Sequence, residues 1–479
     1  MTTPTAEETG QMTHRQVIKA LIGMLLAMMT AMLSSTVVSI ALPTIVGDLN
    51  GTQNQYTWIV TATLLASTAS TPIWGKLSDL FSKKVLIQVS ITIFTLGSIL
   101  AGLAQSTETL IAWRGFQGLG LGGLQALVQI AIAAMVSPRD RGKYMGPLAA
   151  VMGVSTIAGP LLGGLIVGSD WLGWRWCFYA GVPLAVIALI VVQRTLHLPV
   201  IKRKVSIDYA GAIFIAAGVC DLLIWVSLAG KNFDWDSATS YSLAAIGVAL
   251  LAIAIVIETK VPEPIIPLRM FLDRTTSLAT IASIAVGVAM FGGAVFLGQY
   301  FQVARDYSPT KAGLMMLPMM LGSVIGAAGS GQLITRYGRW KRFVVSGAAL
   351  MAIGFGLMST IDHATDIELI WAYLAVLGLG MGLLMQNLVL AVQNNVKATD
   401  LGAASSTVTF FRSMGGVIGV SVLGAVLATR VTDLVAEGLE KLGGPAAKAA
   451  AAGGGEQLDV GTLDGLPDPI ALLVRAAYG

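Results

Sequence analysis

The chain has 479 residues, of which 55% are hydrophobic and 12% are charged, and its mean hydropathy is +0.76. This composition excludes an ordinary soluble domain, in which about a quarter of the residues are charged. The formal net charge of +4 says little until the charges are assigned to the two sides of a membrane. We therefore predict a polytopic protein of the lipid bilayer.

Thirteen apolar segments, each long enough to cross a bilayer as a helix, follow one another between Val17 and Thr429. A helix of about 20 apolar residues spans the hydrocarbon layer of roughly 30 Å. The first segment is too long for a secretory signal, and no cleavage site follows Leu42-Pro43. The predicted spans are 17–46, 56–74, 85–104, 109–136, 145–168, 177–196, 209–229, 241–258, 275–301, 311–334, 343–361, 367–393 and 401–429.

The basic residues are distributed unevenly between the loops. With a cytoplasmic N-terminus, the inner segments carry 20 of the 30 lysine and arginine residues, and the outer loops carry only Arg175, Lys231, Arg305 and Lys311. An excess of basic residues on the cytoplasmic side sets the orientation of membrane proteins. We predict a multi-pass protein of the cell membrane with its N-terminus inside. The basic clusters then need no nucleic-acid partner.

Sites for disulfides, metals and nucleotides are not predicted. Cys177 and Cys220 are too few for a disulfide framework. His14, His197 and His363 lie near helix ends without the spacing of metal ligands. No G-x-x-x-x-G-K-[ST] segment occurs, so ATP is not the predicted energy source.

An internal repeat divides the chain. Each predicted helix corresponds to the eighth one after it, so two additional helices, supplied by Tyr209–Glu258, lie between six-helix halves. Parallel halves of this kind are typical of transporters that rock around a site at their interface. The matches pair Gly75 with Gly331, Gly118 with Gly378 and Gly159 with Gly415, at offsets of 256, 260 and 256 residues.

The predicted fold is an all-α membrane protein with thirteen visible spans. The closing segment Ile470–Gly479 is too short to span, so we expect a fourteenth helix to be missing or truncated. The predicted regions are a cytoplasmic N-terminus at 1–16, an N-terminal six-helix bundle at 17–196, cytoplasmic linkers at 197–208 and 259–274, two inserted helices at 209–258, a C-terminal bundle with five visible helices at 275–429, and an extracellular tail at 430–479.

Four motifs carry a resemblance to a known family. They are the loop Gly75–Lys84, the segment Arg114–Gly120, the glycines and proline of Gly153–Gly164, and Arg412–Gly419. With these motifs the chain resembles the major facilitator superfamily, specifically the fourteen-helix drug:proton antiporter group of EmrB/QacA-type pumps. The resemblance covers nearly the whole chain and implies the fold of two pseudo-symmetric six-helix bundles.

The loop Gly75–Lys84 resembles the family signature G-x-L-x-D-x-x-G-R-K, with Ser82 in place of a glycine. Asp79 can cap a helix end or meet basic residues of a neighbouring helix. The resemblance implies a gate that forms and breaks as the halves rock, whereas a plain charged hairpin is the alternative. The predicted gate residues are Gly75, Asp79, Lys83, Lys84, Arg336 and Arg339.

Arg114 and Gln117 resemble the family's R-x-x-Q-G-x-G motif. An arginine inside a span is costly unless it meets water or a partner. The resemblance implies a role in proton coupling. The alternative is an arginine that reaches back to the outer interface beside Trp113.

The predicted fifth span carries a motif that resembles the antiporter signature, which within the superfamily marks exporters. Proline bends a helix, and glycines let another helix approach closely. The residues are Gly153, Gly159, Pro160, Gly163 and Gly164.

The first span departs from the family. Ser34 stands where the fourteen-helix group has a membrane aspartate, and a serine does not carry a proton. Asp221 is then the only carboxylate near the centre of a span and the first candidate proton carrier, with Asp79 second. A helix-packing role is the alternative for Asp221.

Polar and flexible side chains at the depth of a central cavity are candidate substrate contacts. Buried amides can instead join helices, and methionines can simply pack. Arg412 needs an anionic or carbonyl partner. The candidates are Ser34, Gln125, Gln299, Met381, Gln386, Asn387 and Arg412.

The resulting prediction is a monomeric, proton-coupled exporter of small lipophilic antibiotics or toxic compounds, and not an enzyme. Its partners are the lipid bilayer, protons and a small lipophilic substrate, and it uses the proton gradient without a cofactor. The alternative is a dedicated exporter or facilitator of one endogenous metabolite. A non-transporting receptor or scaffold is the distant alternative, because it needs neither two gate loops nor an embedded Arg114.

Overall fold

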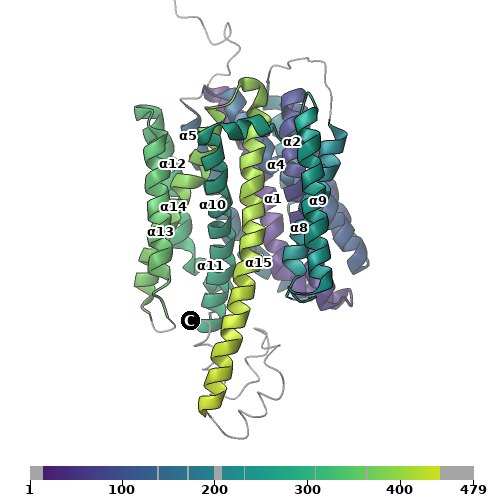
Figure 1. The fold of residues 1–479 in the computed structure, drawn as a ribbon, viewed down its shortest axis with the longest axis vertical. Coiled ribbons are helices and arrows are strands. Elements are labelled where there is room, and N and C mark those ends of the chain that lie inside the picture. Colours follow the sequence, from purple (N-terminus) through teal and green to yellow (C-terminus); the bar gives the residue numbers. More distant parts are fainter. Residues whose placement is uncertain are drawn as a thin grey trace, which may run out of the picture.

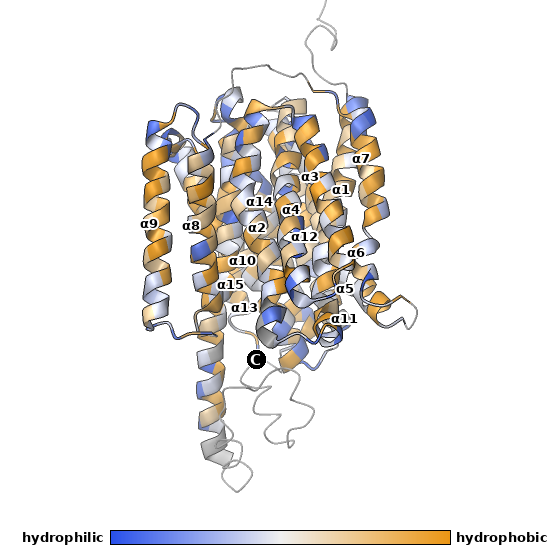
Figure 2. Ribbon diagram, turned by 90° about the vertical axis from the view of Figure 1, so that its right-hand side faces the viewer, coloured by the Kyte–Doolittle hydropathy of each residue, from blue (hydrophilic) through white to orange (hydrophobic). Residues whose placement is uncertain are grey.

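The computed structural model of the chain describes residues 14–137, 140–169, 172–198, 208–230, 232–307, 309–362 and 365–442. Within these ranges all regular structure is helical, apart from one isolated bridge between Ala229 and Phe233. Figure 1 shows the long helices running side by side along one axis. Figure 2 shows apolar residues along the helices and polar residues gathered toward their ends, as expected for helices that cross a bilayer.

In chain order, the helices of the described residues are α1 (His14–Asp48), α2 (Gln53–Leu80), α3 (Lys83–Gly102), α4 (Thr107–Met135), α5 (Arg141–Val167), α6 (Trp176–Tyr179), α7 (Val182–Thr195), α8 (Tyr209–Leu228), α9 (Ala238–Lys260), η1 (Leu268–Leu272), α10 (Arg274–Gln299), η2 (Tyr300–Ala304), α11 (Pro309–Met315), α12 (Leu317–Tyr337), α13 (Trp340–Met358), α14 (Ile367–Gln393), η3 (Ala398–Asp400) and α15 (Leu401–Leu442).

Each predicted span coincides with one long helix or with two helices that follow each other closely. Span 177–196 is divided into α6 and α7, and span 311–334 into α11 and α12. Pro183 and Pro318 stand at the beginning of the second helix of each pair, where a residue without a backbone N–H is tolerated. Eleven helical stretches of the described residues are long and apolar enough to cross a membrane, and α2 and α5 are not among them. The count of thirteen spans therefore remains a prediction.

The last helix is longer than predicted. It continues past Thr429 to Leu442, and Figure 1 shows it projecting beyond the other helices. The extension carries the exposed residues Arg430 and Asp433. The prediction ended at Thr429 because an apolar pattern marks where a membrane span ends, whereas the helical hydrogen bonding continues beyond it. The rest of the predicted tail, 443–479, lies outside the described residues, as do 1–13 and 199–207.

The repeated glycine motif has the same packing role in both halves. A Cβ atom at Gly118 or Gly122 of α4 would lie 2.5 or 2.3 Å from a backbone oxygen of α2. A Cβ atom at Gly378 or Gly382 of α14 would lie 1.9 or 2.0 Å from a backbone oxygen of α12. Only glycine permits this approach, so the α2–α4 pair of the first half recurs as the α12–α14 pair of the second.

The helices that the sequence places between the halves form a pair of their own. α8 packs against α9 and also contacts α2 and α15. Figure 2 shows α8 and α9 together at one side of the molecule. The domain boundaries at 197–208 and 259–274 remain predictions.

We expect Gly378→Ala to lower the stability and membrane abundance of the protein. The added methyl group meets the Met319 carbonyl, and overpacking of this kind costs about 1–3 kcal/mol. The matched control is Gly356→Ala, because a Cβ atom there meets nothing within 4 Å. Thermal unfolding of the detergent-purified variants is the measurement, and equal midpoints for both would refute the packing role.

Candidate functional site

Two helix crossings join the halves, and the first is formed by α2 and α15. A Cβ atom at Gly75 would lie 1.8 Å from Ser406 Oγ and 2.7 Å from the Gly402 carbonyl. A Cβ atom at Gly402 would in turn lie 2.3 Å from the Gly75 carbonyl. The end of α2 and the start of α15 therefore touch through their backbones.

Asp79 caps α15 at this crossing. Its Oδ1 accepts a hydrogen bond of 2.8 Å from Gly402 N, and its Oδ2 accepts one of 2.9 Å from Ala403 N. The first N–H groups of a helix have no partner within the helix and carry the positive end of its dipole. A carboxylate supplied by the other half satisfies both requirements. The sequence alone allowed either a cap or a contact with basic residues, and the structure has the cap.

The second crossing is the counterpart of the first. A Cβ atom at Gly331 of α12 would lie 1.9 Å from the Gly142 carbonyl of α5. Thr335 occupies the position that corresponds to Asp79, and its hydroxyl donates to the Gly331 carbonyl of its own helix at 2.9 Å. The second crossing therefore has the glycine contact of the first, while its residue at the Asp79 position is a threonine.

The end of α14 connects the two crossings. Arg141 at the start of α5 donates to Asn394 Oδ1 at 3.3 Å and to the Ala133 carbonyl at 2.9 Å. Gln393 donates to Ser405 Oγ of α15 at 3.0 Å. Both crossings thus lie at the same end of the helices, and together they close that end. Sequence patterns did not single out Arg141, Asn394 or Gly402, although Gly142 and Gly402 are related by the same offset of 260 residues as Gly118 and Gly378.

The basic residues of the predicted gate have different surroundings. Lys83 donates to the Ser78 carbonyl at 3.0 Å, and Lys84 donates to the Gln193 carbonyl at 2.7 Å, so both bind within the first half. Arg336 stacks on Tyr337, with its guanidinium carbon 5.6 Å from the ring centroid. The structure therefore brings Gly75 and Asp79 into the crossing and leaves these basic side chains outside it.

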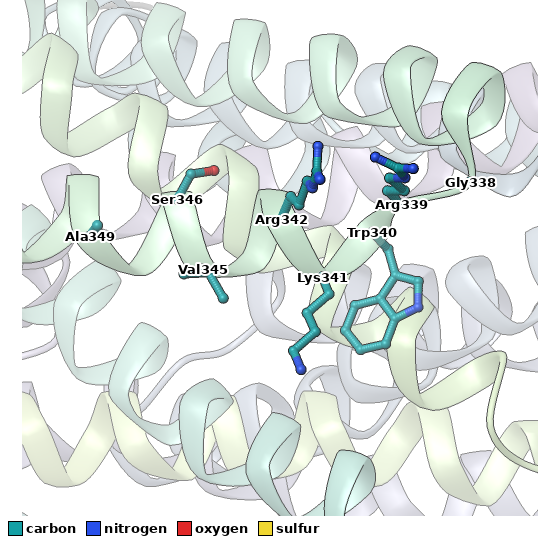
Figure 3. A pocket seen from close by; sticks show the side chains of 8 residues that line it. All are labelled: Gly338, Arg339, Trp340, Lys341, Arg342, Val345, Ser346 and Ala349. Atoms are coloured by element: carbon teal, nitrogen blue, oxygen red, sulfur yellow. The ribbon is translucent and has the colours of Figure 1, made fainter.

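Arg339 lines a hollow of about 750 Å³ around the start of α13, together with Trp340, Lys341 and Arg342. Figure 3 shows Arg339 and Arg342 on one side of the helix and Lys341 and Trp340 on the other. Basic residues and tryptophan gather at the ends of membrane helices as interfacial anchors. The diverging cations do not converge on a single ligand.

Arg114 is 3% exposed and lies in a buried polar network. Its guanidinium donates to Gln117 Oε1 at 2.6 Å and to the Ile59 carbonyl at 3.4 Å. Gln117 Nε2 donates to Ser98 Oγ at 2.6 Å and to Ser34 Oγ at 3.3 Å. Among the described residues no carboxylate pairs with Arg114. This geometry favours an internal role over an arginine that reaches back to the interface.

The glycines of α5 differ in what they contact. A Cβ atom at Gly159 would lie 2.0 Å from Thr36 Oγ1 of α1, and Thr36 also donates to the Ser155 carbonyl at 3.2 Å. Gly153 has its nearest neighbours at 3.8 Å, and Gly164 has none within 4 Å. Gly163 is buried. Pro160 lies inside α5, and its side chain is outside the described residues.

The candidate substrate contacts fall into two groups. In the first, partners are present: Asn387 donates to Ser330 Oγ at 3.0 Å, and Arg412 donates to the Met385 carbonyl at 3.3 Å. The required partner of Arg412 is thus a carbonyl. The Gln125 backbone carbonyl accepts from Gln129 Nε2 at 3.3 Å, a bond that does not involve the Gln125 side chain.

The second group leaves polar atoms without partners. Gln386 is 1% exposed, and neither its Nε2 nor its Oε1 has a hydrogen-bond partner. Gln299 Oε1 is likewise buried and unpaired. Unpaired buried amides are costly, so these two are the strongest candidates for substrate or water contacts. Met381 is buried in an apolar cluster.

Asp221 lies between the two inserted helices. A Cβ atom at Gly247 of α9 would lie 2.7 Å from Asp221 Oδ2, and this oxygen is buried without a partner. The structure therefore places Asp221 at the α8–α9 contact and does not bring it to Arg114.

A family model described as Major Facilitator Superfamily matches residues 24–420. The chain belongs to this superfamily. It is 36% identical over 404 residues to the multidrug transporter protein MdtP of Bacillus subtilis (strain 168), covering 84% of this chain and 74% of that protein. It is 33% identical to Efflux pump dotC of Dothistroma septosporum (strain NZE10 / CBS 128990), covering 92% of this chain and 76% of that protein.

Two further comparisons limit what can be said of the whole protein and of its function. An uncharacterized MFS-type transporter of Mycobacterium tuberculosis (strain CDC 1551 / Oshkosh) is 40% identical over 82% of this chain, which spans only 56% of that relative. The human organic anion transporter MFSD10 has a TM-score of 0.64 at 14% identity, over 86% of this chain and 93% of that chain. This likeness concerns the fold alone.

Together these findings identify a multi-pass membrane transporter of small molecules, with relatives named as multidrug transporters and efflux pumps, and not an enzyme. Membership in the fourteen-helix subgroup remains a prediction.

We expect Asp79→Asn to open the α2–α15 crossing. An amide offers one acceptor oxygen in place of two and carries no charge, and a lost cap costs about 0.5–2 kcal/mol, or about 2- to 30-fold in the open population. The measurement is the rate at which a water-soluble maleimide labels Ser406→Cys in a Cys177→Ser, Cys220→Ser background. Asp433→Asn, an equal charge change on an exposed part of the same helix, is the control. An unchanged labelling rate contradicts the role of the cap.

Proposed function

We propose that this transporter exports lipophilic antibiotics or toxic compounds in exchange for protons, by alternating access across the cell membrane with its N-terminus inside. The observation that carries the proposal is the bond of Asp79 to the first turn of α15 across the glycine contact of the two halves. The names of the relatives MdtP and dotC support an efflux function.

The crossings suit reversible closure. The close neighbours of Gly75, Gly402, Gly142 and Gly331 are backbone atoms and small polar side chains, so the helices can separate without repacking an apolar core. The N–H groups that Asp79 satisfies in the closed state can be hydrated in the open state, so opening exchanges protein hydrogen bonds for water. A contact of this kind can form and break in each transport cycle.

Proton coupling is proposed to involve Arg114 and Gln117. Ser34 accepts a hydrogen bond from Gln117 in the place of the acid that the family motif has there. The proton is then carried by another acid, and Asp221 and Asp79 are the first candidates. Arg114 positions Gln117, which bonds to Ser34 of α1 and Ser98 of α3. Movement of α1, α3 or α4 would therefore change the hydrogen bonds of this network.

Gln386, Gln299 and Met381 are the proposed substrate contacts. The unpaired amide atoms can bind polar groups of a compound, while a methionine adapts to apolar groups of different shape.

One observation favours a second candidate function. The serine at position 34 stands where the family motif has an acid, which also suits a facilitator of one metabolite. Such a protein needs no proton site in α1.

A substrate screen separates the two functions. The chain is expressed in a strain without its own pumps and tested against a panel of lipophilic antibiotics and dyes, with and without a protonophore. We expect resistance to several unrelated compounds and its loss with the protonophore. Transport of a single compound that persists with the protonophore supports the facilitator and overturns the exchanger.

We expect Arg114→Lys to transport poorly at normal abundance. An ammonium group does not reproduce a guanidinium that donates to Gln117 and Ile59 from separate nitrogens. The measurement is substrate-driven proton movement in inverted vesicles at equal protein content. Arg175→Lys is the control, since Arg175 is a half-exposed residue beside Trp174. Normal coupling in Arg114→Lys would show that only the positive charge matters.

A further inference from the structure

The loop between α12 and α13 carries positive charges that the protein itself does not neutralise. Four basic residues stand within 336–342, and no acidic residue occurs in 307–361. Among the described residues, no ion pair or hydrogen bond joins the side chains of Arg339, Lys341 or Arg342 to another residue. The lysines of the corresponding loop in the first half, in contrast, donate to backbone carbonyls. The cations of the second loop are therefore free to meet anions outside the protein.

An apolar row leads from these cations along the outer face of α13. Both buried residues of α13 are glycines that contact α14, so the rest of the helix surface is left to the lipid. Val345 is 60% exposed and Ile353 is 53% exposed. With Ala349 between them, they follow Lys341 at intervals of four residues and form one inclined row on the helix. The row is about 18 Å long at 1.5 Å per residue, close to the roughly 15 Å of hydrocarbon in one leaflet.

The hollow of about 750 Å³ lies where this row meets the cations, and Figure 3 shows the side chains that line it. Trp340 is one of them, and tryptophan in membrane proteins lies at the level of the lipid headgroups. A compact anion needs cations that converge on it, whereas these diverge. A phospholipid instead combines a phosphate at the level of Trp340 with a chain that can follow the apolar row.

We propose that the start of α13 binds anionic phospholipids. Lys341 meets the phosphate of one lipid, whose chain lies along Val345 and Ile353, and Arg339 and Arg342 meet the neighbouring headgroups. Selectivity comes from opposite charge, so an anionic headgroup is preferred to a zwitterionic one. α13 begins beside the end of α12 that carries the second crossing, and with the proposed orientation this is the inner leaflet. The lipid site depends neither on the substrate nor on proton coupling.

The test is native mass spectrometry of the full chain in an uncharged detergent, titrated with phosphatidylglycerol or with phosphatidylcholine of identical chains. We expect tighter binding of phosphatidylglycerol. Lys341→Gln with Arg342→Gln should weaken it by about 5-fold for each lost cation and leave phosphatidylcholine unchanged. The matched control is Lys260→Gln with Arg269→Gln, which removes the same two charges from exposed residues at the same end of the molecule. Equal affinity for the two lipids, or equal weakening in the control, overturns the site.

Two further measurements identify what is recognised. Excess inorganic phosphate should leave phosphatidylglycerol bound, because the chain contributes to binding, and displacement by phosphate alone overturns the lipid site in favour of a free anion. Val345→Asn keeps every cation and places an amide in the apolar row, so it should weaken both lipids several-fold. Unchanged binding of both lipids overturns the proposed path of the chain. If the double variant does not fold, Lys341→Gln alone replaces it, with an expected loss of about 5-fold.

Discussion

The carboxylate of Asp79 holds the first turn of a helix that begins more than three hundred residues later in the chain, and closure of one end of the molecule depends on this contact. A helix start exposes N–H groups that need acceptors, and a carboxylate is the strongest acceptor available. The helix start belongs to α15 of the second half, and the carboxylate belongs to α2 of the first half. The first turn of α15 is therefore capped only when the two halves are in contact at this crossing.

Glycine pairs allow the backbones of the crossing helices to approach closely enough for this contact. At both crossings the backbones meet at Gly75 and Gly402 or at Gly142 and Gly331, so the helix ends are held by contact that any side chain would break. The two crossings are not equivalent, however. The first is capped by an acid, and the second relies on Arg141 and the end of α14. The contact of the first crossing thus depends on an acid, and that of the second on an arginine.

The fold could be predicted from the sequence because the features that determine it are either local, such as apolar length, or repeated, such as the glycine motifs. Apolar length located the helices, and the offset that relates Gly118 to Gly378 identified two packing contacts that the structure has in both halves. Asp79 was identified by its motif, but its partner was not, because the start of α15 carries no pattern that points to α2. The same reason hides the pairing of Lys76 with Glu263, which depends on how the inserted helices pack. The unpaired amide of Gln386 was also beyond prediction, since satisfaction of a buried group depends on every neighbour.

The most direct test of gating at the crossings is a reversible disulfide at the second of them. A Cβ atom at Gly146 would lie 2.8 Å from the Cβ of Ala328, close enough for the usual disulfide separation of about 3.8 Å after a small shift. Gly146→Cys with Ala328→Cys, in protein without other cysteines, should transport when reduced, stop when oxidised and recover on reduction. Undiminished transport by fully oxidised protein would contradict the claim that these crossings open and close in each cycle.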